Sequence, residues 1–476
     1  MKKFKKITAL VMALFLLMSF AEIQSFAVTS IEEYQKYYET LDNTLVMLTP
    51  GKDATELNFA WHSEWSLKAP KVRLSKNADM ADYVEFVGSA TFSENADQRV
   101  NNVTVTGLEE NTTYYYTYGV NGDFSEPVKY QTHSFDSVKF VYVSDVQPHH
   151  KNDLLKESYL WNQSLESAFA RNDDISFIVN GGDITHNGDY NEEWTAFMSP
   201  EYLRSYPMAA ANGNHDKSGT TFTKYFNNPN AYTGIYPMSF GESYWFRYGD
   251  VLFVMINSIR WEAIGNLDTI NAVKAAVEAN PDAKWRVAVT HYDFYGPGPH
   301  VPETKVTEKK KMLVPIFEHY DFDLVLNGHD HVYGRSYFME DDKIVENEGY
   351  STGTVVDPEG ILYVTASGSK GNSRTEGSYN YPWIAKDYIS PNNCYSTIEI
   401  TDDGQLKLVT VDAVTEKVID TFNIVKTDFE PEYEENTFGL YGTLLKEYTG
   451  EYFIIFEMLY DLSTAVKRLF DRIIAA

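Results

Sequence analysis

The chain has 476 residues, and its 40 basic and 68 acidic side chains give a formal net charge of −28. Residues 1–27 contain four lysines and one glutamate, a net +3, so a chain starting at Val28 would carry −31. This acidity argues against a binder of nucleic acid or of anionic membranes, because both need a basic face. With 43% hydrophobic and 15% aromatic residues the chain has material for sizeable cores, which excludes wholesale disorder. The length suggests two or three domains.

The first segment, residues 1–27, has the pattern of a signal peptide. Four lysines precede the mainly apolar run Ile7–Phe20, and Ser25-Phe26-Ala27 offers small residues at the cleavage positions. The run is shorter than the about 20 residues that span a bilayer, so an uncleaved anchor is the weaker alternative. We therefore expect an extracellular protein, secreted or at the cell surface, with no membrane span after signal removal. The single cysteine, Cys394, excludes an internal disulfide and favours a bacterial source. Nothing beside Cys394 would stabilise a thiolate, so we expect an inert, buried thiol.

Residues 41–134 have the pattern of a small all-β domain. Short alternating runs such as Glu56–Trp61 and Asn102–Thr106 are separated by turn residues, which favours a two-sheet sandwich. Leu48-Thr-Pro-Gly51, Phe59-Ala-Trp61 and Val105-Thr-Gly-Leu108 with Asn111–Tyr115 resemble the fibronectin type III module that precedes the catalytic domain of purple acid phosphatases. The domain carries no evident chemistry, so we expect it to act as a spacer.

From residue 135 to 392 strands alternate with helices, which is typical of an α/β domain. The apolar strand-like runs are Phe140–Val143, Ile175–Val179, Val251–Ile256, Val287–Val289, Leu324–Leu326 and Ile361–Val364, and the helical patterns lie at 152–171, 267–279 and 308–320. Short strands return in residues 393–426, where we expect a C-terminal β cap packed on the domain. The tail, 427–476, joins the acidic stretch Glu430–Glu435 to apolar residues at spacings of three and four between Ile455 and Ile473. This predicts an amphipathic helix that docks on the protein itself or on a second copy, as in a homodimer.

Five segments carry metal-binding residue types, and four of them come shortly after strand-like runs named above. Val141–Asp145 and Val179–Asp183 each end in a carboxylate, Ala211–Asp216 contains Asn214 and His215, and His291, His329 and His331 come after the next two strands. Carboxylates, an amide and imidazoles suit a pair of divalent or trivalent ions, and one shared carboxylate can bridge ions about 3.5–4 Å apart. A single Gly-Asp or Gly-Asn-His would more often be a turn. Five such segments in this order are hard to explain by accident and predict a two-metal site.

The order of these motifs resembles the calcineurin-like metallophosphoesterases, and with the N-terminal module the chain looks like a purple acid phosphatase relative over residues 41–425. The resemblance implies an αββα four-layer sandwich with two mixed sheets and a dinuclear site at the carboxyl ends of the strands. It also implies a role for each motif residue: Asp145 and His331 on the first metal, Asp183 as the bridge, Asn214, His291 and His329 on the second metal, and His215 as the catalytic acid.

Two positions depart from the family pattern. Gln147 stands where the family usually has His or Gly, and His186 stands where purple acid phosphatases have a tyrosine. Without that tyrosinate we expect no purple colour. Either Gln147, through its amide oxygen, or His186, through a ring nitrogen, completes the first metal site, with a slight preference for His186. The metals are divalent or mixed-valence, with Fe, Zn and Mn as the candidates.

The implied function is hydrolysis of phosphate monoesters in a small phosphorylated substrate. Hydroxide formed at the metals attacks phosphorus in line, and His215 protonates the leaving group. A phosphodiesterase or nucleotidase is the alternative, and a binding protein with a vestigial metal site is a remote one. Secondary substrate-binding candidates are His300, Tyr333 and Arg335, each weighed against an ordinary packing or surface role. His149 and His150 lie at the same rim, and Asp216 more plausibly caps a turn than binds metal.

Overall fold

The computed structural model describes residues 30–42, 44–92, 99–216, 222–234, 242–260, 263–369, 379–389 and 391–427. The predicted signal peptide and almost all of the predicted C-terminal tail lie outside these residues. Residues 1–40 form one unit and residues 41–476 another. Within the first unit, α2 (Ile31–Tyr38) begins at Ser30, whose hydroxyl accepts a hydrogen bond from the Glu33 amide at 3.3 Å. Among the described helices, none has both the length and the apolar character needed to cross a membrane.

The N-terminal β domain is a two-sheet sandwich, as the alternating pattern predicts. One sheet has the order β1-β2-β6-β5 and the other β4-β3-β7-β8, with β9 also paired to β7. The strands are β1 (Met47–Pro50), β2 (Glu56–Ser63), β3 (Lys71–Ser75), β4 (Val84–Val87), β5 (Ser89–Phe92), β6 (Arg99–Thr106), β7 (Thr113–Val120), β8 (Asp123–Phe124) and β9 (Val128–Gln131). Alternate residues of each strand, among them Phe59 and Trp61 of β2 and Tyr114 and Tyr116 of β7, fill the core between the sheets.

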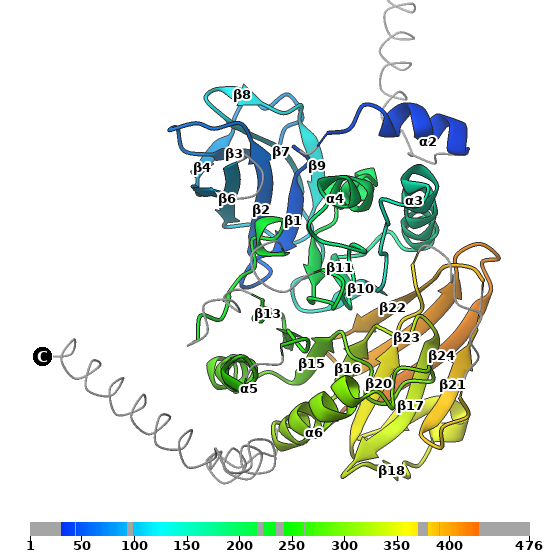
Figure 1. Ribbon diagram of the computed structural model, residues 1–476. Coiled ribbons are helices and arrows are strands. Elements are labelled where there is room, and N and C mark those ends of the chain that lie inside the picture. The colour runs from blue at the N-terminus through cyan, green and yellow to red at the C-terminus, as the bar shows by residue number, and fades with distance from the viewer. Residues whose placement is uncertain are drawn as a thin grey trace, which may run out of the picture. The chain divides into compact units, whose positions relative to one another are not determined.

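The first sheet of the α/β domain has the order β12-β11-β10-β22-β23-β24-β19. Its strands are β10 (Val138–Val143), β11 (Phe177–Asn180), β12 (Met208–Ala210), β19 (Thr354–Val356), β22 (Cys394–Ile400), β23 (Gln405–Asp412) and β24 (Val418–Val425). The last three strands correct the expectation of a separate cap. β22 pairs with β10 in the middle of the sheet, so these orange strands of Figure 1 continue the catalytic sheet. Cys394 is buried at the start of β22, and burial raises the pKa of its thiol to about 12.

The second sheet has the order β13-β14-β15-β16-β20-β17-β18, with β21 also paired to β17. Its strands are β13 (Tyr244–Tyr248), β14 (Val251–Ile256), β15 (Trp285–Thr290), β16 (Leu324–Asn327), β17 (Tyr333–Glu340), β18 (Lys343–Val345), β20 (Ile361–Thr365) and β21 (Ile384–Tyr388). The helices are α3 (Leu154–Arg171), α4 (Asn191–Met198), α5 (Ala263–Ala279) and α6 (Thr304–His319), and three short 3₁₀ turns are described at Glu201–Arg204, Phe222–Lys224 and Tyr350–Thr352.

The side-chain pattern of the strands arranges these elements in four layers. In β10, Phe140 and Tyr142 face the second sheet, whereas Val141 and Val143 face the other way and share a core with α3 and α4. In β14, Phe253 packs between the sheets, and its neighbours in the strand pack with residues of α5 and α6. Because both faces of these central strands are buried, they are continuous apolar runs in the sequence. The αββα arrangement implied by the motif order is confirmed (Figure 1).

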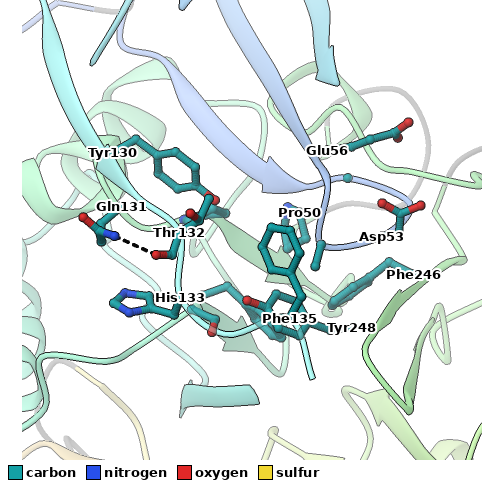
Figure 2. Close-up of a pocket in the computed structure, with 15 residues that line it drawn as sticks. Pro50, Asp53, Glu56, Tyr130, Gln131, Thr132, His133, Phe135, Phe246 and Tyr248 are labelled. Carbon is teal, nitrogen blue, oxygen red and sulfur yellow. Dashed lines mark hydrogen bonds between the residues drawn. The ribbon is translucent and has the colours of Figure 1, made fainter. Parts of the chain in front are cut away.

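Hydrogen bonds join the β domain to the α/β domain, and a small pocket is lined by residues of both. The Tyr116 hydroxyl donates to the Arg204 carbonyl at 2.7 Å, and the Ser205 hydroxyl donates to the Lys129 carbonyl at 3.0 Å. Figure 2 shows the pocket, lined from the β domain side by Tyr130 and from the α/β domain side by Phe246 and Tyr248, among others. None of the predicted metal-binding side chains lines this pocket. The pocket therefore belongs to the domain junction.

Candidate metal centre

The predicted metal-binding side chains all lie just beyond the carboxyl ends of strands. In the first sheet, Asp145, Asp183 and Asn214 come after β10, β11 and β12, which are parallel neighbours. In the second sheet, His291 comes after β15, and His329 and His331 come after its parallel neighbour β16. The carboxyl ends of neighbouring parallel strands meet at one edge of a sheet. The fold therefore brings residues almost 190 positions apart to the same place.

Left-handed backbone conformations occur at most of these positions. The φ angle is +54° at Asp145, +51° at Asp183, +75° at His329 and +56° at His331. Such conformations cost of order 1–3 kcal/mol each in residues other than glycine, and they persist where surrounding structure enforces them. Glycine is required beside them: a Cβ on Gly328 would lie 2.6 Å from an oxygen of Asp145. The strain therefore serves to turn the side chains into the site.

The first ligand cluster consists of Asp145, Asp183 and His331, whose candidate ligand atoms lie within 4.8 Å of one another. His331 Nε2 is 3.1 Å from Asp145 Oδ1. The other Asp145 oxygen accepts a hydrogen bond from the His329 amide at 3.0 Å, which ties the loop after β10 to the loop after β16. The two sheets are thus joined at the site itself.

The second cluster consists of Asp183, His291 and His329, with Asn214 beside it. His291 Nε2 lies 3.3 Å from Asp183 Oδ2 and 3.2 Å from Asn214 Oδ1. His291 Nδ1 lies 3.0 Å from the Gly181 carbonyl, to which it donates, so Nε2 is the nitrogen that faces the cluster. Because Asp183 belongs to both clusters, the six predicted ligands form one site with a shared carboxylate.

One buried atom of this site is suited to hold a cation. His329 Nε2 is buried and has no hydrogen-bond partner among the described residues. Buried polar atoms are nearly always paired, so an unpaired imidazole nitrogen among other ligand atoms indicates a metal-binding role. The residues present therefore fit a dinuclear metal site.

The charges within the second cluster are coupled. Burial raises the pKa of Asp183 and lowers that of His291, but their mutual attraction prevails: the pKa of Asp183 stays well below its ordinary value and that of His291 rises to about 9. Burial and the His291 charge push the pKa of His329 far down, so His329 is a neutral ligand at neutral pH. A cation that binds Asp183 and His291 must displace the His291 proton. Its affinity should therefore fall as the pH falls below about 9.

His215 lies at the open side of the cluster. Its amide donates to Asp183 Oδ1 at 2.8 Å, and its Nδ1 donates to the His186 carbonyl at 2.9 Å. Its Nε2 is 4.0 Å from Asp183 Oδ2, and about a third of the side chain, 32%, is exposed. The backbone bonds hold the ring by Nδ1 and leave Nε2 directed to the space beside Asp183, where a substrate can reach it.

Gln147 and His186 occupy different positions relative to the cluster. The Gln147 amide nitrogen is 2.5 Å from Asp183 Oδ2, so this side chain is in direct contact with the shared carboxylate. The His186 ring lies between the rings of His149 and His215, with centroids 3.8 Å and 4.6 Å away. Among the described residues, the ligand clusters that contain Asp145 do not include His186.

Two further histidine clusters lie at the rim. His300 Nδ1 is 2.5 Å from a Glu303 oxygen, and the His300 ring centroid is 4.6 Å from that of His329. His300 is thus brought to the site, as expected of a substrate contact, and Glu303 is a partner that the sequence did not reveal. At the other side, His150 bonds to the buried Glu193 at 2.6 Å and stacks on Tyr190.

The structure contradicts substrate binding by Tyr333 and Arg335. Both side chains are buried, and both donate to the same Asp420 oxygen on β24, at 2.8 and 2.7 Å. Both lie in the first three residues of β17, and their bonds to Asp420 of β24 show that they face the other sheet.

Asp216 accepts hydrogen bonds from the Thr185 and Gly213 amides and so holds the turn that contains it.

Comparisons with known proteins agree with this geometry. Residues 138–333 match the calcineurin-like phosphoesterase family, and residues 44–135 match the purple acid phosphatase N-terminal domain. A purple acid phosphatase from yellow lupin (Lupinus luteus) seeds superposes with a TM-score of 0.61 at 17% identity, over 80% of this chain and 74% of that one. The structure of PhoD gives a TM-score of 0.55 at 12% identity, over 86% of this chain and 98% of that one. No curated protein matches the sequence.

The fold and the paired ligand clusters define a metal-dependent phosphoester hydrolase. More narrowly, the chain combines a calcineurin-like phosphoesterase domain with a preceding purple acid phosphatase N-terminal domain. Such an enzyme acts on phosphorylated substrates.

Proposed function

We propose that this protein hydrolyses phosphate monoesters outside the cell, at a site that holds two metal ions. The observation that carries the proposal is the convergence of five side chains from both sheets into two clusters that share Asp183, with Asn214 in contact with His291. The purple acid phosphatase N-terminal domain supports the monoester preference, and the lysine-rich, apolar residues 1–27 support export.

We assign Asp145, His331 and Gln147 to the first metal and Asn214, His291 and His329 to the second, with Asp183 on both. The contact of the Gln147 amide with Asp183 supports Gln147 over His186, and in this assignment the amide is turned so that its oxygen faces the metal. An amide oxygen suits Mn²⁺ among the candidates Fe, Zn and Mn. When bound, two such ions act as Lewis acids toward a phosphoryl group and lower the pKa of water.

The chain itself supplies the proton for the leaving group. His215 is fixed at Nδ1 by the His186 carbonyl, so a proton on Nε2 is available on the exposed side of the ring. General acid catalysis of this kind contributes typically 10²–10⁴-fold to the rate. His300, braced by Glu303, adds a donor at the opposite rim that can contact the phosphoryl oxygens.

The assignment of Gln147 and His186 can be tested with single variants. Gln147→Ala should lower the affinity for the first metal by about 10–100-fold, because a group in contact with the shared carboxylate is lost. His186→Ala should keep both metals and lower kcat through the position of His215. The measurement is metal content by mass spectrometry after dialysis at a series of free-metal concentrations. Loss of one metal in His186→Ala with full occupancy in Gln147→Ala would reverse the assignment.

The function itself is tested with matched substrates. Protein reconstituted with Zn²⁺, Mn²⁺ or Fe²⁺ should hold about two metals per chain and cleave p-nitrophenyl phosphate faster than bis(p-nitrophenyl) phosphate. Faster cleavage of the diester would favour the phosphodiesterase alternative. Two bound metals with cleavage of neither ester would contradict the proposal and favour a binding protein.

The remaining expectations concern assembly and location. We propose that residues 427–476 dock on this protein or on a second copy and form a homodimer, because their apolar residues recur at helical spacing. Because position 186 is histidine and not tyrosine, we further predict that the enzyme lacks the purple colour of a tyrosinate–metal pair.

A further inference from the structure

Three aromatic rings stack beside the loop that leads to the metal centre. Tyr379, Tyr381 and Trp383 lie just before β21, and a turn at Pro382 and Trp383 is closed by the Ile384 amide, which donates to the Tyr381 carbonyl at 3.1 Å. The ring centroids of Tyr379 and Tyr381 are 6.0 Å apart and those of Tyr381 and Trp383 4.6 Å apart, with interplanar angles of 14° and 12°. We call these three residues the aromatic ladder.

The inner end of the ladder is firmly held. The Trp383 indole donates to the Gly296 carbonyl at 3.1 Å, and its ring packs against Tyr295 with centroids 6.0 Å apart. The Lys310 ammonium lies 5.3 Å from the centre of the Trp383 ring and 3.7 Å from that of Tyr295. The inner rings are therefore rigid supports.

The outer end of the ladder is open. Tyr379 is 50% exposed, although its ring stacks on that of Tyr381. Stacking on Tyr381 fixes the orientation of the Tyr379 ring, and its exposed face can stack against another planar ring. The ladder is thus preorganised for an aromatic ligand.

The ladder is coupled to the catalytic rim through the Gly296–Pro299 loop. The Tyr379 amide donates to the Pro297 carbonyl at 2.9 Å. His300 is three residues further on, at most about 11 Å along an extended chain, and its ring contacts that of His329. Burial and the nearby charge of Asp330, between the ligands His329 and His331, raise the pKa of Tyr381. The ladder is therefore joined by a backbone hydrogen bond to the loop that leads to His300 at the catalytic site.

We propose that the aromatic ladder binds a planar ring of the leaving group, and that the preferred substrates are nucleotides. This inference rests on the proposed phosphoesterase function and names its substrate class. The phosphoryl group would lie at the metal centre near His300, while the base stacks on the outer face of Tyr379. Stacking of this kind does not depend on the hydrogen-bonding pattern of the base, so purine and pyrimidine nucleotides would both bind.

The test compares adenosine 5′-monophosphate with ribose 5-phosphate, which share the scissile ester and differ in the base. Wild type should show a KM about tenfold lower for the nucleotide. Tyr379→Ala should raise the nucleotide KM about tenfold, with kcat and the ribose 5-phosphate KM unchanged, and Tyr379→Phe should behave as wild type. Tyr83→Ala, which removes a 44% exposed tyrosine from the β domain, is the matched control.

Equal KM values for the two esters in wild type, or a parallel change for both in Tyr379→Ala, would overturn the inference. Saturation-transfer NMR with adenosine separates this from a failure of the proposed function, because it needs no turnover. Base protons that receive saturation from wild type but not from Tyr379→Ala would support the ladder even if neither ester is cleaved. Transfer that is absent, or equal in both proteins, would overturn it.

Discussion

Replacing Asp183 by Asn should abolish metal binding at both positions and reduce phosphatase activity by more than about 100-fold. Changes outside the ligand shell already cost 10–100-fold, and Asp183 is the carboxylate that both clusters share. Asparagine matches aspartate in shape and tolerates the left-handed backbone at this position, where φ is +51°. The substitution therefore removes the charge with little disturbance of the fold.

The measurement is the metal-dependent rise in Tm together with metal content and activity. A ligand that binds only the folded state stabilises it by about 2.7 kcal/mol at about a hundredfold excess over Kd, so wild type should show a clear shift and Asp183→Asn none. Asp189→Asn is the matched control, because it removes an exposed aspartate from the same loop. Two metals retained in Asp183→Asn would exclude a bridging carboxylate at this position.

Replacing His215 by Ala should lower kcat about 10²–10⁴-fold while both metals stay bound. The contact of residue 215 with Asp183 is made by its backbone amide at 2.8 Å, which alanine retains. The ring is about a third exposed, so its loss leaves no large cavity. The expected defect is thus in proton transfer and not in the assembly of the site.

A series of substrates with different leaving groups separates a defect in proton transfer from a defect in the assembly of the site. The defect of His215→Ala should be large for alkyl phosphates, whose leaving oxygen needs a proton, and small for p-nitrophenyl phosphate, whose leaving oxygen does not. His133→Ala, at the junction between the domains, serves as the control histidine. An equal defect across the series, or loss of metal in His215→Ala, would show that His215 supports the site without donating a proton.

The central strands and the metal-binding motifs were predictable because their signals are local. Strands buried on both faces need continuous apolar runs, and Phe140–Val143 and Leu324–Leu326 lie within β10 and β16. Polar residues directly after such runs must lie at the strand ends. Asp145, Asp183 and His291 could therefore be placed at the carboxyl ends of their strands before any distance was known.

Pairing between distant strands left no comparable signal. The short strands after Asn393 alternate like those of any antiparallel hairpin, and only the register of β22 against β10 shows that they complete the catalytic sheet. The same sheet contains the buried Asp420. Tyr333 and Arg335 donate hydrogen bonds to its carboxylate, so they do not line the metal centre, where their position in the sequence had suggested a substrate contact.

The residues of this chain thus determined by themselves the class of fold, the metal-binding residue types and their order, because each depends on a short apolar run and on the few polar residues directly after that run. Tertiary structure decided which side chains meet. It brought Gln147 into contact with Asp183, paired His300 with Glu303, and stacked Tyr379 on Tyr381. These contacts depend on backbone turns and on packing between segments far apart in the chain, and neither leaves a periodic pattern in the sequence.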